Sequence, residues 1–142
     1  IEGLSPSYFK KIMESYIRVK GSKDFTSSYI LLHSLHKDEK FYIWGDLQGA
    51  FHSLVRTLND LKEKNIMRDD FQIVDPHHYF IFNGNVIGRS LYNLETLSLI
   101  ITLILKNPQN VIYLKGPHEE KRFWLNLGLR NELEILAKGL SS

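Results

Sequence analysis

The sequence predicts an α/β domain built on a mostly parallel sheet. Three short apolar segments recur along the chain, at 41–44, 79–82 and 111–114, and helical patterns separate them. Short apolar strands that alternate with helices are typical of βαβ units, in which the strands are parallel and the crossovers right-handed. Each segment is followed by a loop of glycine and polar residues, and α/β sheets build their sites on such loops at the carboxyl ends of strands.

The first forty residues are expected to add a helix and a strand that pack on the rest, residues 41–142, within a single structural domain. Either Ser5 or Ser7 is placed to cap the helix. Apolar and aromatic side chains follow at helical spacing: Tyr8, Phe9, Ile12, Met13, Tyr16 and Ile17. Residues 29–32 are predicted to form a strand that pairs with 41–44 across a polar connector of hairpin length.

A helix is predicted after each of the first two motif strands, and another at the C-terminal side. Apolar residues at intervals of three and four predict an amphipathic helix that ends near Lys64: Phe51, Leu54, Val55, Leu58 and Leu61. Residues 65–78 form a loop-rich connection, and the next helix covers 91–105, ended by Pro108, which cannot continue it. The last helix is expected at 131–138. The aromatic residues expected in the core are Trp44, Phe51, Phe80 and Phe82.

Composition argues against several classes of function. The net charge is +2, and the 18 basic residues are scattered among 16 acidic ones, so binding to nucleic acid is not supported. The chain has no cysteine, which excludes disulfides, thiolate metal sites and a cysteine nucleophile, and fits a cytoplasmic origin. The longest apolar stretch, 97–105, is too short to span a bilayer, and no signal-peptide core is visible. We therefore expect neither a nucleic acid nor a membrane as partner.

The loops after the three strands carry the motifs Gly45-Asp46-Leu47-Gln48-Gly49, Gly84-Asn85-Val86-Ile87-Gly88-Arg89-Ser90 and Gly116-Pro117-His118-Glu119. In order and spacing they resemble the motifs of the calcineurin-like metallophosphoesterases, and within them of the phosphoprotein phosphatases that hydrolyse phosphoserine and phosphothreonine. That family has GDxHG, GDxxDRG and GNHE. The resemblance runs from about Phe41 to about Leu136. Because these phosphatases are considerably longer, the chain resembles their N-terminal half, a layered βαβαβ half-domain.

The resemblance implies a site for two divalent metals, such as Mn or Fe and Zn, with several ligands altered. Asp46 matches an aspartate that binds the first metal, and Gln48 stands in the place of a metal-binding histidine. Asn85 replaces the aspartate that bridges both metals, and Pro117 replaces an asparagine that binds the second. A neutral amide is a poor substitute for an imidazole or a bridging carboxylate, and proline cannot ligate. We therefore predict vestigial metal positions, no metal and no other cofactor.

Two further residues match the substrate-binding and catalytic residues of the family. Arg89 matches the arginine that binds the substrate phosphate, and His118 matches the catalytic histidine, which we expect to be vestigial. Gly88 replaces the aspartate that supports this histidine. Simpler roles stay open: Asp46 as a helix cap, Arg89 as a structural arginine and His118 as a hydrogen-bonded packing residue. Other histidines that could bind a metal opportunistically are His52, His77 and His78.

The leading hypothesis is a catalytically inactive phosphatase-like module that binds a protein partner or forms part of a larger protein. One alternative is a metal-dependent serine/threonine phosphatase fragment that needs a missing C-terminal half. Another is a metal-free binder of phosphate or phosphopeptide that uses Arg89 with nearby basic residues: Lys115, His118, Lys121 and Arg122. A half-fold should expose apolar surface. We expect the N-terminal helix to cover that surface through Tyr8, Phe9, Ile12 and Tyr16, or else the chain to self-associate.

Overall fold

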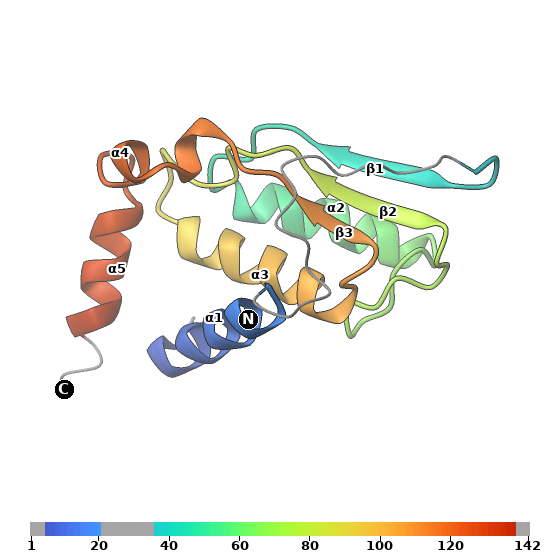
Figure 1. Ribbon diagram of the computed structural model, residues 1–142, viewed down its shortest axis with the longest axis horizontal. Coiled ribbons are helices and arrows are strands. Elements are labelled where there is room, and N and C mark those ends of the chain that lie inside the picture. Colours follow the sequence, from blue (N-terminus) through green and yellow to red (C-terminus); the bar gives the residue numbers. More distant parts are fainter. Residues whose placement is uncertain (1–4, 21–35, 139–142) are drawn as a thin grey trace.

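The structure is a computed structural model that describes residues 5–20 and 36–138. Along the chain it contains helices and strands that alternate after the first helix (Figure 1). They are α1 (Pro6–Lys20), β1 (Lys40–Trp44), α2 (Phe51–Glu63), β2 (His78–Phe82), α3 (Asn93–Lys106), β3 (Val111–Tyr113), the 3₁₀ helix η1 (Pro117–Glu119), α4 (Lys121–Trp124) and α5 (Leu129–Lys138). The predicted strand at 29–32 lies outside the described residues.

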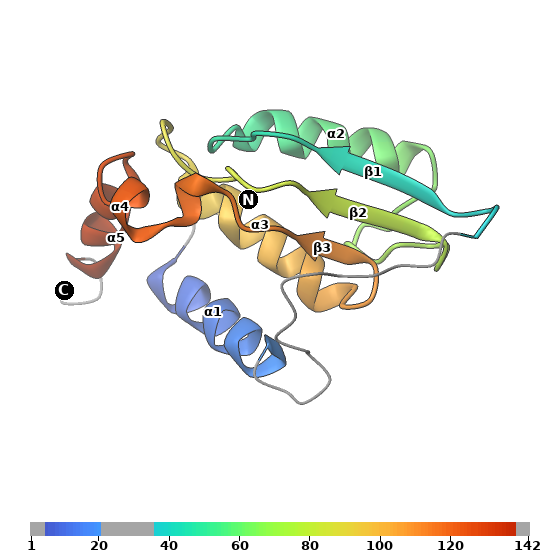
Figure 2. The same cartoon turned by 45° about the horizontal axis from the view of Figure 1, so that its top comes forward.

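The described strands form one parallel sheet in the order β1-β2-β3 (Figure 2). The register pairs Trp44 with Phe82 and Phe82 with Tyr113, so the three strands end at a common edge. Helices α2 and α3 connect consecutive strands, which confirms the α/β fold class and the predicted βαβαβ order. The ends of these elements differ from the predicted ones by one or two residues.

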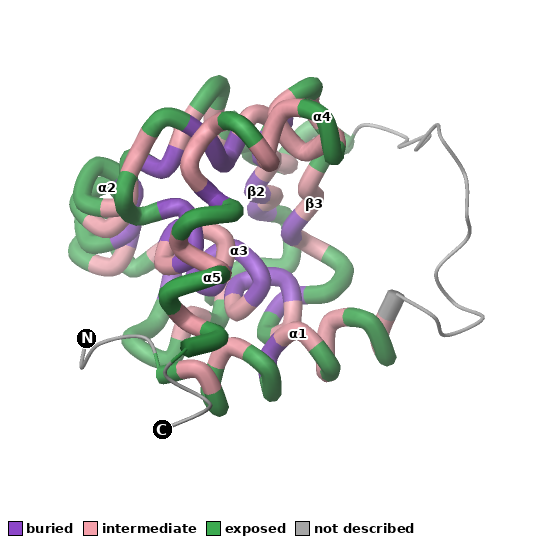
Figure 3. Tube along the Cα trace, turned by 90° about the vertical axis from the view of Figure 1, so that its left-hand side faces the viewer, coloured by how far each residue is buried: buried purple, intermediate pink, exposed green. Residues whose placement is uncertain are grey.

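The hydrophobic core lies between one face of the sheet and the helices α2 and α3. Phe80 and Phe82 of β2 are fully buried there, and the same core cluster includes Leu54 of α2 and Ile100 of α3. Buried segments accordingly gather along β2 and α3 (Figure 3). Trp44 stacks on Phe82 with ring centroids 4.8 Å apart. Trp44 and Phe51 pack against this cluster but remain partly exposed, so their predicted burial is only partial.

The opposite face of the sheet is apolar and partly exposed. Alternate residues of a strand point to opposite faces, and the register therefore places five side chains together on this face: Phe41, Ile43, Tyr79, Ile81 and Ile112. We call these five the outer sheet face. Phe41 stacks on Tyr79 at 5.3 Å, and Ile43 is 67% exposed. Ile81 and Ile112 are half-buried.

Helix α1 does not cover the outer sheet face, which corrects the role expected for it. It packs against α3, within the helical layer, as both Figure 1 and Figure 2 show. Ile12 is buried, and Phe9 and Tyr16 pack against the core from the same side of the helix. The Ser5 hydroxyl accepts the Tyr8 amide hydrogen at 3.2 Å and so caps the helix. The buried side of α1 therefore packs within the helical layer and not on the outer sheet face.

Helix α5 begins two residues earlier than expected and stabilises the start of α3. The Glu132 carboxylate accepts hydrogen bonds from the backbone N–H groups of Asn93 and Leu94 at 3.2 and 2.9 Å, and from the Asn93 side chain at 2.6 Å. A carboxylate is favourable at a helix N-terminus because the first N–H groups have no partner within the helix. Within the described ranges, no helix is long and apolar enough to cross a membrane.

Candidate functional site

The loops that follow β1 and β2 are joined by backbone hydrogen bonds at the carboxyl edge of the sheet. Gln48 N–H donates to the Asn85 carbonyl at 2.9 Å, and Gly49 N–H donates to the Val86 carbonyl at 2.7 Å. The two loops therefore hold one another in a defined position. The first two sequence motifs, separated by more than thirty residues of chain, lie side by side in the fold.

Glu119 joins the loop after β3 to the loop after β2. Its two carboxylate oxygens accept the backbone N–H groups of Gly116, Asn85 and Val86 at 2.7, 2.9 and 2.8 Å. The backbones of the two loops approach so closely that a Cβ at Gly84 would lie 2.6 Å from the Gly116 nitrogen. Hydrogen bonds to a charged acceptor are the stronger kind. Glu119 thus fixes the third motif against the second.

Asp46 lies at the centre of the resulting cluster and is surrounded by amide groups. The Asn85 Nδ2 group is 3.2 Å from each of its carboxylate oxygens, and Gln48 Nε2 is 3.3 Å from Oδ2. We call Asp46, Gln48 and Asn85 the amide cluster. Here the carboxylate accepts hydrogen bonds from N–H groups of neutral side chains, in the position where the family resemblance implies a metal ion.

The orientation of the Asn85 amide follows from its second partner. Its Oδ1 atom accepts the backbone N–H of His118 at 3.0 Å, so its nitrogen faces Asp46. Rotating the amide by 180° would point the oxygen at a carboxylate and the NH₂ group at another N–H. Both contacts would be repulsive, and the hydrogen-bond network therefore selects the orientation with nitrogen toward Asp46.

His118 lies in η1 and is held by the backbone of the second motif. Its Nδ1 atom is 2.9 Å from the Ile87 carbonyl oxygen, which can only accept, so Nδ1 carries the proton. A Cβ at Gly88 would lie 2.8 Å from this nitrogen. The carbonyl therefore takes the supporting role that the resemblance assigns to an aspartate at position 88, and the imidazole occupies the space that such a side chain would need.

Arg89 is exposed at the same edge. Its backbone N–H donates to the Leu127 carbonyl at 2.8 Å, which fixes the backbone while leaving the side chain outside. Among the described residues its guanidinium has no hydrogen-bond or ion-pair partner. By contrast, Arg122 pairs with Glu120 at 3.1 Å and lies over the Phe123 ring. Of the basic residues named from the sequence, Arg122 is therefore already engaged.

Strained backbone marks these loops. Gln48, Asn85 and Arg89 have φ angles of 48°, 50° and 61°, in the left-handed region that non-glycine residues rarely adopt. Such residues persist where their surroundings hold them, and they cluster at functional sites. Gln48, Asn85 and Arg89 thus share a left-handed backbone conformation, which also occurs outside the motif loops at Asn65 and Phe71.

The structure also bears on the helix-capping role considered for Asp46 and on the metal-binding role considered for His52, His77 and His78. Asp46 does not cap α2, whose N-cap is Ala50 without a side-chain hydrogen bond. His78 is buried, whereas His77 is exposed and its Nδ1 lies 3.0 Å from Asp75, so the two neighbouring histidines do not converge. His52 packs on Tyr92 with ring centroids 4.9 Å apart. Within residues 5–20 and 36–138, no group of three or more histidine, aspartate or glutamate side chains is positioned to hold a metal ion.

Sequence reasoning did not assign the structural role of Glu119 or its contact with Tyr113. Burial, and after it the charge and hydrogen bond of Glu119, raises the pKa of Tyr113 well above its usual range. The sequence indicated only that Glu119 belongs to the third motif, not which groups its carboxylate would bind. Tyr113 ends an apolar strand, and nothing in the sequence indicates which carboxylate it meets.

The described side chains do not fit a two-metal centre of the kind the resemblance implies. Such a centre needs anionic and imidazole ligands around both ions. Here Asn85 presents N–H groups to Asp46, Gln48 does the same, and Pro117 has no donor atom in its side chain. A cation between these groups would face the positive ends of amide dipoles.

Comparison with known proteins places this chain in a family. The model of the family described as calcineurin-like phosphoesterase matches residues 39–139. The chain is 30% identical over 91 residues to the serine/threonine-protein phosphatase PP2A-like PPG1 of Candida albicans. This alignment covers 63% of this chain and 19% of that protein. It is 29% identical over 90 residues to the serine/threonine-protein phosphatase 6 catalytic subunit of Drosophila melanogaster, covering 63% of this chain and 26% of that protein.

The fold is also similar to a solved phosphatase structure. A protein serine/threonine phosphatase from Saccharomyces cerevisiae, described as similar to human phosphatase PP5, superposes with a TM-score of 0.65 at 21% identity. The match covers 93% of this chain and 38% of that one. The chain thus spans well under half the length of the proteins it matches. From the family match over most of its length, together with the three motif loops at one edge of the sheet, the chain belongs to the calcineurin-like phosphoesterase family.

Proposed function

We propose that this protein is a catalytically inactive, phosphatase-like module that acts through protein interaction or as part of a larger protein. The observation that carries the proposal is the contact of Asn85 Nδ2 with both carboxylate oxygens of Asp46, at 3.2 Å each. A hydrogen-bond donor stands where hydrolysis would need a ligand that attracts cations.

The chemistry of hydrolysis explains why this contact matters. Two-metal phosphatases activate water on bound cations, which lowers the pKa of that water far below the roughly 15.7 of bulk water. Without cations the nucleophile is ordinary water, which is too weakly acidic to supply hydroxide at neutral pH. A proton donor in the position of His118 would not by itself generate the nucleophile.

The test of inactivity combines metal content with turnover. After loading with Mn²⁺ and dialysis, elemental analysis should find no stoichiometric metal. We expect no hydrolysis of p-nitrophenyl phosphate or of phosphoserine peptides above buffer. Turnover that follows the protein through purification, disappears in His118→Ala and persists in the control His36→Ala would overturn the proposal. That outcome would instead favour the metal-dependent phosphatase fragment.

The outer sheet face supports the interaction part of the proposal. Its side chains are apolar, and Ile43 at its edge is 67% exposed. A large exposed apolar patch normally marks an interaction surface. We infer that another polypeptide covers it, either a partner or a further part of the same protein.

The substitution Ile43→Lys tests this use of the face. Because the side chain is mostly exposed, we expect the free energy of unfolding to change by less than about 0.5 kcal/mol. Analytical ultracentrifugation of the isolated chain should show concentration-dependent association that the lysine abolishes. The control Thr57→Lys places the same charge on the exposed side of α2 and should leave association unchanged. A chain that stays monomeric at all concentrations and binds no apolar dye would argue against the interface.

A metal-free phosphate or phosphopeptide binder is the second candidate, and Arg89 favours it. Its guanidinium is exposed at the motif edge and unpaired among the described residues, and Arg is suited to bidentate phosphate binding. Phosphate or a phosphoserine peptide should then bind in the presence of a chelator, and Arg89→Ala should abolish binding. Arg68→Ala, an exposed arginine on another loop, is the matched control.

A further inference from the structure

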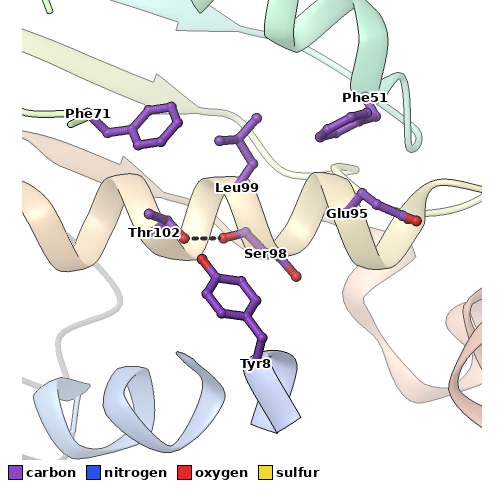
Figure 4. Close-up of a pocket in the computed structure, with 7 residues that line it drawn as sticks. All are labelled: Tyr8, Phe51, Phe71, Glu95, Ser98, Leu99 and Thr102. Atoms are coloured by element: carbon purple, nitrogen blue, oxygen red, sulfur yellow. Dashed lines mark hydrogen bonds between the residues drawn. The ribbon is translucent and has the colours of Figure 1, made fainter. Parts of the chain in front are cut away.

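A cavity of about 150 Å³ lies between α1, α2 and α3, away from the motif loops. Helix α3 provides one wall, with Tyr8 of α1 facing it from one side and the aromatic rings of Phe51 and Phe71 from the other (Figure 4). The residues that line it are Tyr8, Phe51, Phe71, Glu95, Ser98, Leu99 and Thr102. None of them belongs to the amide cluster or to the three motif loops.

The walls of the cavity are apolar and held in place by the core. Two of them are the rings of Phe51 and Phe71, and the third is the branched side chain of Leu99. Leu99 belongs to the hydrophobic core cluster, and both phenylalanines pack against it. Tyr8 is 47% exposed, so the cavity opens to solvent beside this ring and a ligand can enter without unfolding.

The polar side chains of the lining offer nothing that would pair with a charged ligand. The Ser98 hydroxyl donates its proton to the Leu94 carbonyl at 2.6 Å, and the Thr102 hydroxyl donates to the Ser98 carbonyl at 2.8 Å. Both protons are thus used within α3. The Glu95 carboxylate points away from Leu99 and the Phe71 ring (Figure 4), and its Oε2 atom is buried out of reach of the cavity.

Water in such a space finds few hydrogen-bond partners, and an apolar molecule that displaces it gains dispersion contacts with the walls. We infer that the cavity binds a neutral apolar molecule of about the size of benzene, between the two phenylalanine rings and Leu99. A charged molecule would lose its hydration without gaining a partner. A nucleotide or another large cofactor would need a pocket of about 300 Å³ or more. The inference is independent of the proposed pseudophosphatase function.

Benzene, benzylammonium and benzoate are suitable probes because they share a ring and differ in charge. In titrations of the whole chain followed by NMR, benzene should bind with a dissociation constant on the order of 1 mM. The two charged probes should bind more weakly by about tenfold or more, because their charge would have to leave water. Intermolecular NOEs should connect benzene with the methyl groups of Leu99 and Thr102, whereas amide signals of the motif loops should not shift.

Thr102→Leu tests the location, because the larger apolar side chain fills the cavity from the α3 wall. It should weaken benzene binding by about tenfold or more. Thr57→Leu is the matched control and should leave the affinity unchanged. Thr57 is exposed on α2, and its hydroxyl, like that of Thr102, donates to the carbonyl four residues earlier. The NOEs in the unaltered protein locate benzene even if the Thr102 variant does not fold.

Three results would overturn the inference: no saturable binding of benzene, NOEs that place benzene elsewhere, or equal affinity for benzylammonium. The source of the apolar group is tested with Nα-acetyl-phenylalanine methylamide, which carries the same ring on a peptide backbone. The cavity has the volume of the ring alone, so this compound should not displace benzene. Displacement would instead identify a polypeptide side chain as the ligand and refute a free small molecule. All titrations are done in chelator, so the result does not depend on phosphatase activity.

Discussion

Replacing Asn85 by aspartate should destabilise the protein, although the family resemblance implies aspartate at this position. The amide nitrogen now lies 3.2 Å from both carboxylate oxygens of Asp46. In Asn85→Asp a second carboxylate would face the first at nearly the same distance. Two favourable contacts would be lost and one repulsive contact created, while the acceptor for the His118 backbone N–H would be kept.

The size of the stability loss follows from the distance between the two carboxylates and from their exposure to solvent. Two unit charges about 4 Å apart repel by about 1 kcal/mol in bulk water and about 4 kcal/mol near a protein surface. Because Asp46 is exposed, the lower half of this range applies, and the lost hydrogen bonds add about 0.5 kcal/mol. We therefore expect a loss of about 2 kcal/mol, which for a domain of this size lowers Tm by roughly 8 °C.

Urea unfolding at low ionic strength, pH 7.5 and with chelator measures the effect. Asn59→Asp adds the same charge on the exposed side of α2 and should cost less than about 0.5 kcal/mol. The double variant Asp46→Asn/Asn85→Asp exchanges amide and carboxylate and should recover at least half of the loss. Added salt should reduce the loss, because it screens the two exposed charges.

Two outcomes would refute this reasoning. The first is an Asn85→Asp variant as stable as the wild type in chelator, since the hydrogen bonds from the amide to Asp46 would then contribute nothing to stability. The second is a double variant no more stable than Asn85→Asp alone. Millimolar Mn²⁺ should raise the Tm of Asn85→Asp more than that of the wild type, because a cation can replace the lost amide between the two carboxylates.

Three further perturbations test other parts of the structure. Glu119→Gln should cost about 2–3 kcal/mol in urea unfolding, because a charged acceptor of three backbone N–H groups becomes neutral, whereas Glu120→Gln should cost less than about 0.5 kcal/mol. Gly88→Ala should cost about 1–3 kcal/mol, because φ is 109° there and the new Cβ would lie 2.8 Å from His118 Nδ1; an unchanged His118 imidazole NMR signal would contradict this. The raised pKa of Tyr113 means that the folded state keeps its proton while the unfolded state loses it above pH 10.0, so stability should fall as pH rises beyond that value. Tyr113→Phe should flatten this alkaline decline in unfolding experiments from pH 9 to 11, and an equally steep decline would exclude Tyr113 as its source.

The order and nature of the described elements could be predicted from the sequence because they depend on neighbours along the chain. Apolar spacing in 51–63 and 93–106 selects helices, and the short apolar runs before each motif select strands. The position of the motif loops followed as well, because parallel strands end at the same edge of a sheet. The short helices η1 and α4 were missed, since segments of this length carry no periodic signal.

The contacts of the candidate site, in contrast, were decided by the tertiary structure. Asn85 is 39 residues from Asp46, and the direction of its amide depends on the backbone of His118, 33 residues further along. Likewise, the apolar stripe of α1 could have packed on either layer, and the structure places it against α3. Local patterns specify what a segment can bury or donate. Which group it meets depends on competition among all surfaces that the fold brings within a few ångströms, and that competition is settled only in three dimensions.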